Sequence, residues 1–382
     1  MWSRGFRPLF LAAGLWAVIA MAIWAPCFSG EVSVPTAFSP IDWHVHEMIY
    51  GYGSAVAAGF LLTAIPNWTG RLPVAGRPLA LLCALWALGR AAVFVSEIVG
   101  RAPAAACDTL FLIVFAGVAG REVIAARNLR NLKIVVLALM FAAANVGFHV
   151  ETALAGTAPT FARMGLAILI FLILLIGGRV VPSFTHNWLA KRAIAARPVS
   201  LGRPDGLVMT LSGLALTLWV ALPGLPAVGA MLIAAGAANL WRLSRWRGWT
   251  TRSDRLVLIL HLGFFFAGLG FIVVGAAPLM PGFVPAAAGV HVWAVGAVGT
   301  MTLAMMTRAT LGHTGRDLQA SRGTQAIYLA IVVAMGARVA MALTPVYALS
   351  LMNVAAFAWI VAFLGFVALY GPMLVRPRAD AS

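Results

Sequence analysis

The sequence predicts an all-α protein, a polytopic integral membrane bundle of about twelve transmembrane helices with both termini in the cytoplasm. The prediction rests on the composition, the length of the apolar runs and the placement of the basic residues. Of the 382 residues, 62% are hydrophobic and only 10% are charged, and the mean hydropathy is +0.95. Soluble domains carry roughly 25% charged residues. A core of this size cannot bury so many apolar side chains, so lipid must be the solvent.

Twelve apolar runs have a length suited to crossing a bilayer. Arg4 and Arg7 precede the first run, a pattern that would also suit a signal peptide. An uncleaved first span is expected, because the run is long enough to cross a bilayer and similar apolar runs follow along the whole chain. Pro223 and Pro226 separate the seventh run from the eighth, because proline interrupts a helix. The expected spans lie near residues 9–25, 46–66, 78–98, 106–122, 134–152, 163–182, 206–222, 225–241, 255–275, 286–307, 325–344 and 349–374.

Along the chain, connections that are rich in basic residues alternate with connections that hold few or none. The fourth connection holds Arg121, Arg127, Arg130 and Lys133, whereas the third holds only Arg101 and the first holds none. Even-numbered connections and both ends follow the basic pattern, which places them in the cytoplasm. This placement explains the net charge of +16 without a nucleic-acid partner. No connection is long enough for a soluble domain, so residues 1–382 form one transmembrane domain. No internal repeat of the transporter type is evident.

Histidines inside or at the ends of apolar runs are candidate functional residues, because ionisable side chains are costly in a membrane. His44 and His46 open the second span, His149 lies near the outer end of the fifth beside Glu151, and His291 opens the tenth. These four histidines are expected at one depth, roughly 5–10 Å inside the outer boundary at about 1.5 Å rise per residue. They would form a shared metal or haem site, or each would be a hydrogen-bonded residue at the interface.

The neighbours of these histidines suggest how an imidazole would be oriented. On a helix, His44 and His46 would point about 200° apart, so they would serve different sites or only one would be a ligand. Glu47 would share a helix face with His44 and would hold its ring as a second-sphere partner. Asn145, in the middle of the fifth span, is expected to hydrogen-bond across helices.

Further polar residues lie within or beside other spans. Arg90 and Arg338 belong to the outer half and would pair with a haem propionate or with a carboxylate such as Glu97 or Glu151. The alternatives are a structural ion pair or a side chain that reaches back to the interface. His261 lies about two turns into the ninth span. His186 and His313 fall in cytoplasmic connections and are expected to be solvated. No Cys-x-x-Cys pair supports covalent haem attachment, and a b-type haem is the expected form.

Five segments of the chain are distinctive: residues 6–10 (FRPLF), 43–48 (WHVHEM), 58–71 (AGFLLTAIPNWTGR), 177–185 (GGRVVPSFT) and 291–316, which ends in LGHTGR. In these segments, and along essentially its full length, the chain resembles the NnrS family of bacterial membrane proteins. The resemblance implies a haem- and copper-containing protein of the bacterial cytoplasmic membrane, linked to denitrification and to resistance against nitric oxide. It directs attention to His44, His46, Glu47, His291 and His313 as metal-binding residues, and to Arg308.

Together these observations predict haem and copper as cofactors, with His44, His46, His149, His261, His291, Arg90 and Arg338 as the cofactor-binding residues. One hypothesis is a protein that converts nitric oxide by redox chemistry and draws electrons from a quinol or another donor. A second is a non-catalytic haem protein for electron transfer, sensing or scavenging. A third is a transporter of copper, haem or an ion linked to denitrification.

Overall fold

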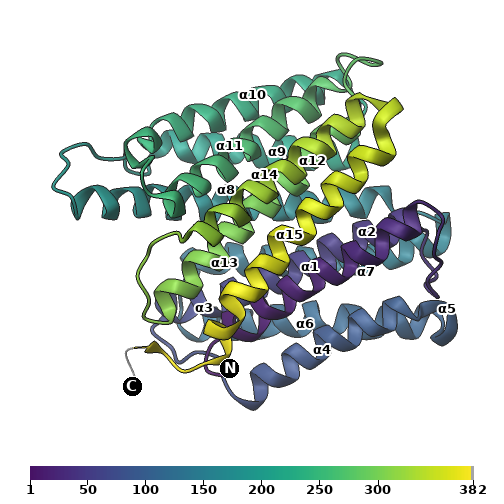
Figure 1. Cartoon of the computed structure of the whole chain (residues 1–382), viewed down its shortest axis with the longest axis horizontal. Coiled ribbons are helices and arrows are strands. Elements are labelled where there is room, and N and C mark those ends of the chain that lie inside the picture. The colour runs from purple at the N-terminus through teal and green to yellow at the C-terminus, as the bar shows by residue number, and fades with distance from the viewer. Residues whose placement is uncertain (380–382) are drawn as a thin grey trace. The chain divides into compact units, whose positions relative to one another are not determined.

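The computed structural model describes residues 1–379, and within them it contains helices and no strand (Figure 1). Among these described residues, twelve helices are long and apolar enough to cross a membrane, which confirms the predicted number of spans. The spans comprise Phe6–Phe28, Pro40–Thr69, Arg77–Phe94, Arg101–Ala125, Leu129–Ala155, Pro159–Ala190, Arg203–Ala221, Pro226–Ser244, Arg255–Ala276, Ala286–His313, Arg322–Leu343 and Pro345–Val375. The predicted placement of the termini in the cytoplasm stays a prediction.

The chain divides into two compact units, and the prediction of a single domain is not tested by this division. The first unit comprises residues 1–168, 310–316 and the chain from Phe366 on; the second comprises residues 169–309 and 317–365. The first contains α1 (Phe6–Phe28), α2 (Pro40–His46), α3 (Ser54–Thr69), α4 (Arg77–Phe94), α5 (Ser96–Val99), α6 (Arg101–Ala125) and α7 (Leu132–Ala155). It also takes in the start of α8 (Pro159–Ala190) and the ends of α13 (Thr300–His313) and α15 (Ala348–Val375).

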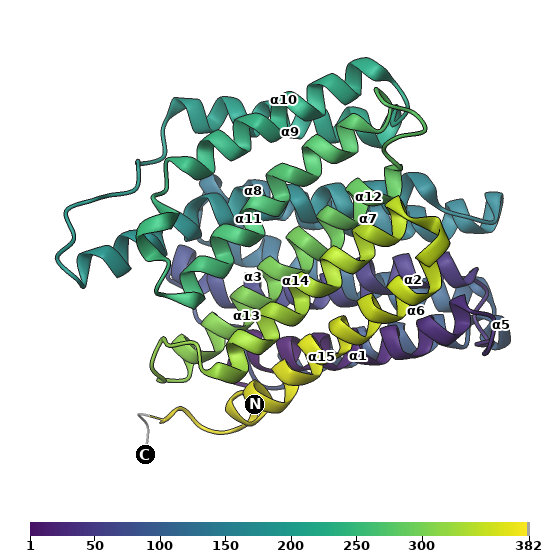
Figure 2. The ribbon, with the colours of Figure 1, turned by 45° about the horizontal axis from the view of Figure 1, so that its top comes forward.

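Within the first unit, α6 packs against both α4 and α7, and α1 packs against α3. In the second unit, α10 (Pro226–Ser244) packs against both α9 (Arg203–Ala221) and α11 (Arg255–Ala276). Helix α10 lies at the upper edge of the view in Figure 2. The short helix α12 (Ala286–His291) packs against α14 (Arg322–Leu343). Buried polar residues from different spans lie within each unit, among them Asp108 and Asn145 in the first and Ser212 and Asn239 in the second.

Two spans contain a π-helical segment, and each segment begins directly after a histidine. His46 ends α2 and is followed by η1 (Glu47–Gly53); His291 ends α12 and is followed by η4 (Val292–Gly299). π-Helical turns are rare and occur often at functional sites, because the extra residue redirects side chains along the helix. The structure therefore singles out two of the predicted histidines by backbone geometry alone.

The two π-containing spans also share a sequence pattern that we did not recognise from the sequence. Each histidine is followed by a glycine five residues later, Gly51 or Gly296, and by Thr-Gly-Arg at the same spacing, ending at Arg71 or Arg316. The glycine of each Thr-Gly-Arg has a positive φ of 70° or 73°, which ends the helix in the left-handed conformation that favours glycine. They lie in the second and the tenth of the twelve spans, which the predicted topology has cross the membrane in the same direction, so they do not support an inverted repeat of the transporter type.

Candidate metal centre

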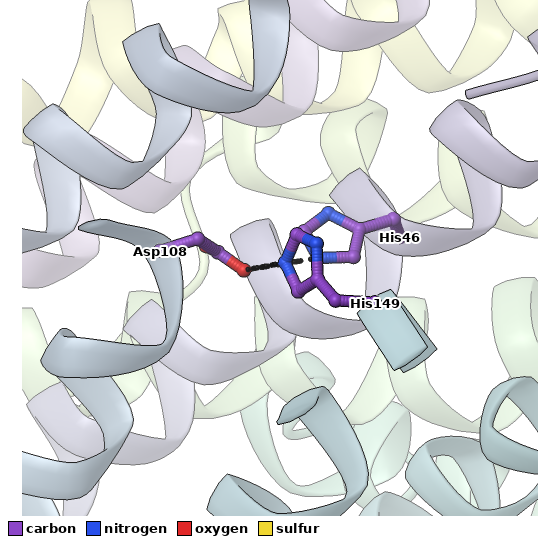
Figure 3. Close-up of side chains that lie close together, drawn as sticks. All are labelled: His46, Asp108 and His149. Atoms are coloured by element: carbon purple, nitrogen blue, oxygen red, sulfur yellow. Dashed lines mark hydrogen bonds and ion pairs between the residues drawn. The ribbon is translucent and has the colours of Figure 1, made fainter. Parts of the chain in front are cut away.

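A buried group of two imidazoles and one carboxylate lies in the interior of the first unit (Figure 3). His46 comes from α2, Asp108 from α6 and His149 from α7. The Asp108 Oδ2 atom lies 3.1 Å from His46 Nε2 and 2.9 Å from His149 Nε2. The three donor atoms lie within 4.8 Å of one another, and within residues 1–379 no other group of three potential metal ligands converges this closely.

A second layer of polar side chains holds these three residues. Glu47 Oε1 lies 3.1 Å from His46 Nδ1, so the carboxylate orients the imidazole from the side opposite Asp108. Arg90 donates to Glu47 Oε2 at 2.6 Å and also forms an ion pair with Asp108. Asn145 donates to Asp108 Oδ2 at 2.9 Å through Nδ2, and its Oδ1 lies 3.1 Å from His46 Nε2. The contacts of Asn145 confirm the predicted hydrogen bond across helices.

Glycines allow the helices to approach closely enough to form this network. A Cβ atom added at Gly89 would lie 2.9 Å from the backbone Cα of Asp108, so the absence of a side chain lets α4 bring Arg90 beside α6. A Cβ atom at Gly51 would lie 2.6 Å from Glu47 Oε2 and 2.9 Å from Arg90 Nη1. A larger residue at Gly89 would collide with the backbone of Asp108, and one at Gly51 would collide with the Glu47 and Arg90 side chains.

The charge balance of the centre favours a bound cation. Glu47 and Asp108 contribute two negative charges, whereas Arg90 contributes one positive charge, and the side chains of all three are at most 5% exposed. With both imidazoles neutral, one negative charge would remain uncompensated in a region that strongly disfavours buried charge. Both ring nitrogens of His46 face oxygen atoms, so a proton on His46 or a metal ion at the three donors would balance the charge.

The donor set fits a single metal ion. Imidazole nitrogen and carboxylate oxygen bind Zn²⁺ at about 2.0–2.2 Å, so donors that share such an ion lie roughly 3–3.6 Å apart. The two distances to Asp108, 3.1 and 2.9 Å, lie near the short end of this spacing, and the full set of three, within 4.8 Å, would draw together around an ion. Imidazole suits copper, zinc and iron, and two histidines with one carboxylate are typical of non-haem iron sites that keep open positions.

Aromatic rings enclose the centre and oppose a haem at this position. The ring centroids of Phe38, Phe148 and Tyr50 lie 5.3, 5.1 and 5.4 Å from that of His46. An axial haem ligand must direct a nitrogen at the iron along a clear path to the porphyrin. The Nε2 atom of His46 instead faces Asp108 and Asn145. The arrangement fits an ion better than it fits a porphyrin.

Several predicted partners differ in the structure. Glu47 lies against the ring of His46, whereas His44 stacks on Trp24 with ring centroids 4.0 Å apart. Arg90 pairs with carboxylates as predicted, but they belong to Glu47 and Asp108. The predicted carboxylate Glu151 instead accepts hydrogen bonds from the backbone at the start of α8.

Other predicted residues have separate surroundings. In the second unit, His291 Nδ1 lies 2.7 Å from the carbonyl oxygen of Ala287, and the Arg338 guanidinium acts on it electrostatically. His261 Nε2 lies 2.8 Å from the Thr185 hydroxyl in the same unit. His313 belongs to the first unit, where it is half-buried beside Phe6 and not a freely solvated loop residue. Of the four outer histidines, the structure brings together His46 and His149.

Asp108 is the central residue that the sequence analysis missed. It lies near the start of an apolar run, directly after Cys107, where a carboxylate is as costly as the histidines that were considered. The rule that flagged those histidines would therefore also have flagged Asp108. The missing information was its neighbours, which come from α2, α4 and α7.

The fold and this centre define a class of protein: a polytopic helical membrane protein with a buried candidate metal site that is linked to further charged side chains. The chain belongs to the NnrS family, whose model, described as NnrS protein, matches residues 1–378. This match confirms the resemblance identified in the sequence. A search of curated proteins found no match. Membership supports a role tied to the response to nitric oxide and suggests metal or haem binding.

Proposed function

We propose that this chain is a metal-containing protein of the bacterial cytoplasmic membrane that handles nitric oxide. Its centre would hold one copper ion between His46, Asp108 and His149. The observation that supports the proposal most directly is the convergence of three buried donor atoms within 4.8 Å in a member of the NnrS family. Nitric oxide is a small apolar gas that partitions into lipid, so it reaches a buried site without a polar channel.

The residues around the centre have distinct tasks in this proposal. The imidazoles of His46 and His149 and the carboxylate of Asp108 would hold the ion. Glu47 fixes the ring of His46 through Nδ1, and Arg90 partly neutralises the two carboxylates. A bound copper ion would supply a coordination position and a redox electron. Mutation of residues that hold metal ligands in this way typically lowers metal affinity or activity by 10- to 100-fold.

A b-type haem would be held in the second unit, with His291 as the proposed axial ligand. Its Nδ1 atom donates to the Ala287 carbonyl, which leaves Nε2 as the nitrogen able to bind iron. Arg338 supplies a positive charge nearby that suits a propionate. The position of His291 directly before a π-helical segment, shared with His46, supports a functional role.

The first experiment is a metal and haem analysis of the full chain purified in mild detergent. The matched variants are His149→Gln, at the centre, and His186→Gln, at an exposed position near the end of α8. The wild type and His186→Gln should retain about one copper ion per chain, whereas His149→Gln should lose it. Retention of iron without haem would favour a non-haem iron site instead, because the same donor set is typical of one. Equal metal content in all three proteins would contradict this site.

The manner of action is tested by optical spectra with and without nitric oxide and by turnover. We propose reduction, in which two nitric oxide molecules, two electrons and two protons yield nitrous oxide and water, with a quinol as donor. Binding without turnover would leave a non-catalytic role in electron transfer, sensing or scavenging. Loss of all cofactors on purification, together with copper or haem uptake into vesicles, would favour a transporter.

A further inference from the structure

A basic cavity lies at one end of the first unit. It is formed where α1 begins and α15 ends, near the N label of Figure 1. Its volume is about 280 Å³, roughly nine times the 30 Å³ that one water molecule occupies in the liquid. The cavity is therefore large enough for a polyatomic anion. Its ionisable lining residues are Arg4, Arg7, His313, Arg376 and Arg378.

Three segments that are distant in sequence are fixed around this cavity. Arg7 Nη1 donates to the carbonyl oxygens of Leu374 and Arg376 at 3.0 and 2.6 Å, which joins the start of α1 to the end of α15. The backbone nitrogen of Ala379 donates to the Thr314 carbonyl at 3.0 Å, which joins the chain after α15 to the residue after α13. The ring of His313 lies 5.4 Å from that of Phe6. These contacts give the cavity defined walls.

The charge in the cavity is of one sign. Four arginines line it, and no carboxylate does so among the described residues. The cytoplasmic orientation signal accounts for arginines on one side of the membrane, but it does not require four of them to line one cavity. Guanidinium groups brought together repel one another. An anion would relieve this repulsion.

We propose that this cavity binds a phosphate-type anion. Guanidinium groups present paired N–H donors that match phosphate oxygens, and they stay charged at every physiological pH. The cavity lies at the ends of membrane-spanning helices, so the phosphate can come from an anionic phospholipid headgroup or from a free phosphate compound. The same positive field disfavours a metal cation at His313, whose surroundings suit an anion.

The test uses the full chain, stripped of lipid in detergent at fixed ionic strength. The probes are short-chain phosphatidylglycerol, short-chain phosphatidylcholine and inorganic phosphate, each followed by calorimetric titration and by mass spectrometry of the intact complex. The variant Arg4→Gln/Arg376→Gln removes two arginines of the cavity. The control Arg130→Gln/Arg252→Gln removes the same charge from exposed positions elsewhere.

We expect one phosphatidylglycerol per chain, with a Kd that rises about tenfold for each lost arginine and thus about a hundredfold in the cavity variant. The control should change Kd less than threefold. Phosphatidylglycerol binding that inorganic phosphate does not displace identifies a lipid headgroup; saturable binding of inorganic phosphate identifies a free anion. Absence of binding by both anionic probes, or equal losses in the two variants, would overturn the proposal.

Discussion

Both units contain a buried arginine paired with carboxylate, yet only the group in the first unit has more carboxylates than arginines. In the second unit, Arg242 donates to Asp205 Oδ1 at 2.9 Å, and Asp205 Oδ2 accepts from the Gly202 backbone at 3.0 Å. In the first unit, Arg90 faces both Glu47 and Asp108, and those carboxylates face the two imidazoles as well.

This difference separates a structural ion pair from a candidate functional centre. Asp205 faces Arg242 and also Arg245, whose Nη1 lies 3.7 Å from Asp205 Oδ2, so its negative charge is fully compensated. Asn239 extends the pair with a hydrogen bond to Ser212 at 2.8 Å. The Arg90 group has an excess of negative charge and a set of donors that suit a metal. Buried charge alone therefore does not mark a site in this protein; the excess carboxylate beside imidazole does.

The largest effect is expected for Arg90→Met. This change would leave Glu47 and Asp108 buried without their shared counter-ion, and breaking a buried pair costs about 3–5 kcal/mol. The free energy of unfolding, measured by denaturant titration in mixed micelles, should fall by that amount. The control is Arg179→Met, which removes an exposed arginine from α8 and should change the free energy by less than about 1 kcal/mol. Equal losses would mean that Arg90 stabilises the fold no more than a surface arginine.

A somewhat smaller loss is expected for Asp205→Asn, about 3 kcal/mol at the low end of the range for a broken buried pair. Arg242 keeps contacts with the Trp246 and Phe264 rings, whose centroids lie 5.5 and 5.8 Å from its guanidinium carbon. The double variant Asp205→Asn/Arg242→Met should lose less than the sum of its single changes. Metal content per chain should stay at the wild-type value. A loss of metal in Asp205→Asn would remove the distinction between the two groups.

An intermediate effect is expected for Asn145→Leu, because Asn145 contacts both Asp108 and His46. Unfolding should become easier by about 1–2 kcal/mol, the usual cost of leaving a buried polar group unpaired. The Kd for copper, measured by competition with a chelator of known affinity, should rise about tenfold. Asn239→Leu in the second unit is the matched control, since it should cost similar stability without altering copper affinity. The same Kd in both variants would contradict a supporting role for Asn145.

The sequence was sufficient for the spans because membrane insertion depends on local properties. Length and hydropathy of each run indicated all twelve helices, and glycine or proline near several ends agreed with the observed boundaries. The same local reasoning indicated that His46, His149, Glu47, Arg90 and Asn145 were costly in a membrane. It could not pair them, because their contacts join α2, α4, α6 and α7 across long sequence separations.

The misassigned partner of Glu47 has a local cause. A regular α-helix through residues 44–47 places Glu47 on the same face as His44. In the structure, Glu47 begins a π-helical segment and contacts its immediate neighbour His46, while His44 stacks on Trp24. Nothing in the residue types at positions 47–53 distinguishes a π-helical turn from an α-helical turn. The register of such a segment depends on the packing around it, so the sequence alone could not fix which histidine Glu47 contacts.

The smallest effect, and the sharpest test of the sequence-based ligand set, is expected for His44→Phe. A phenyl ring can keep the stacking on Trp24, so the free energy of unfolding should change by less than about 1 kcal/mol. Copper content should remain at the wild-type value, whereas His46→Phe should abolish it. His44→Phe and His46→Phe differ by two positions in one helix and remove the same chemical group. Copper loss in His44→Phe alone would place the ligand on the Trp24 side of α2 and leave the His46, Asp108 and His149 group as a purely structural network.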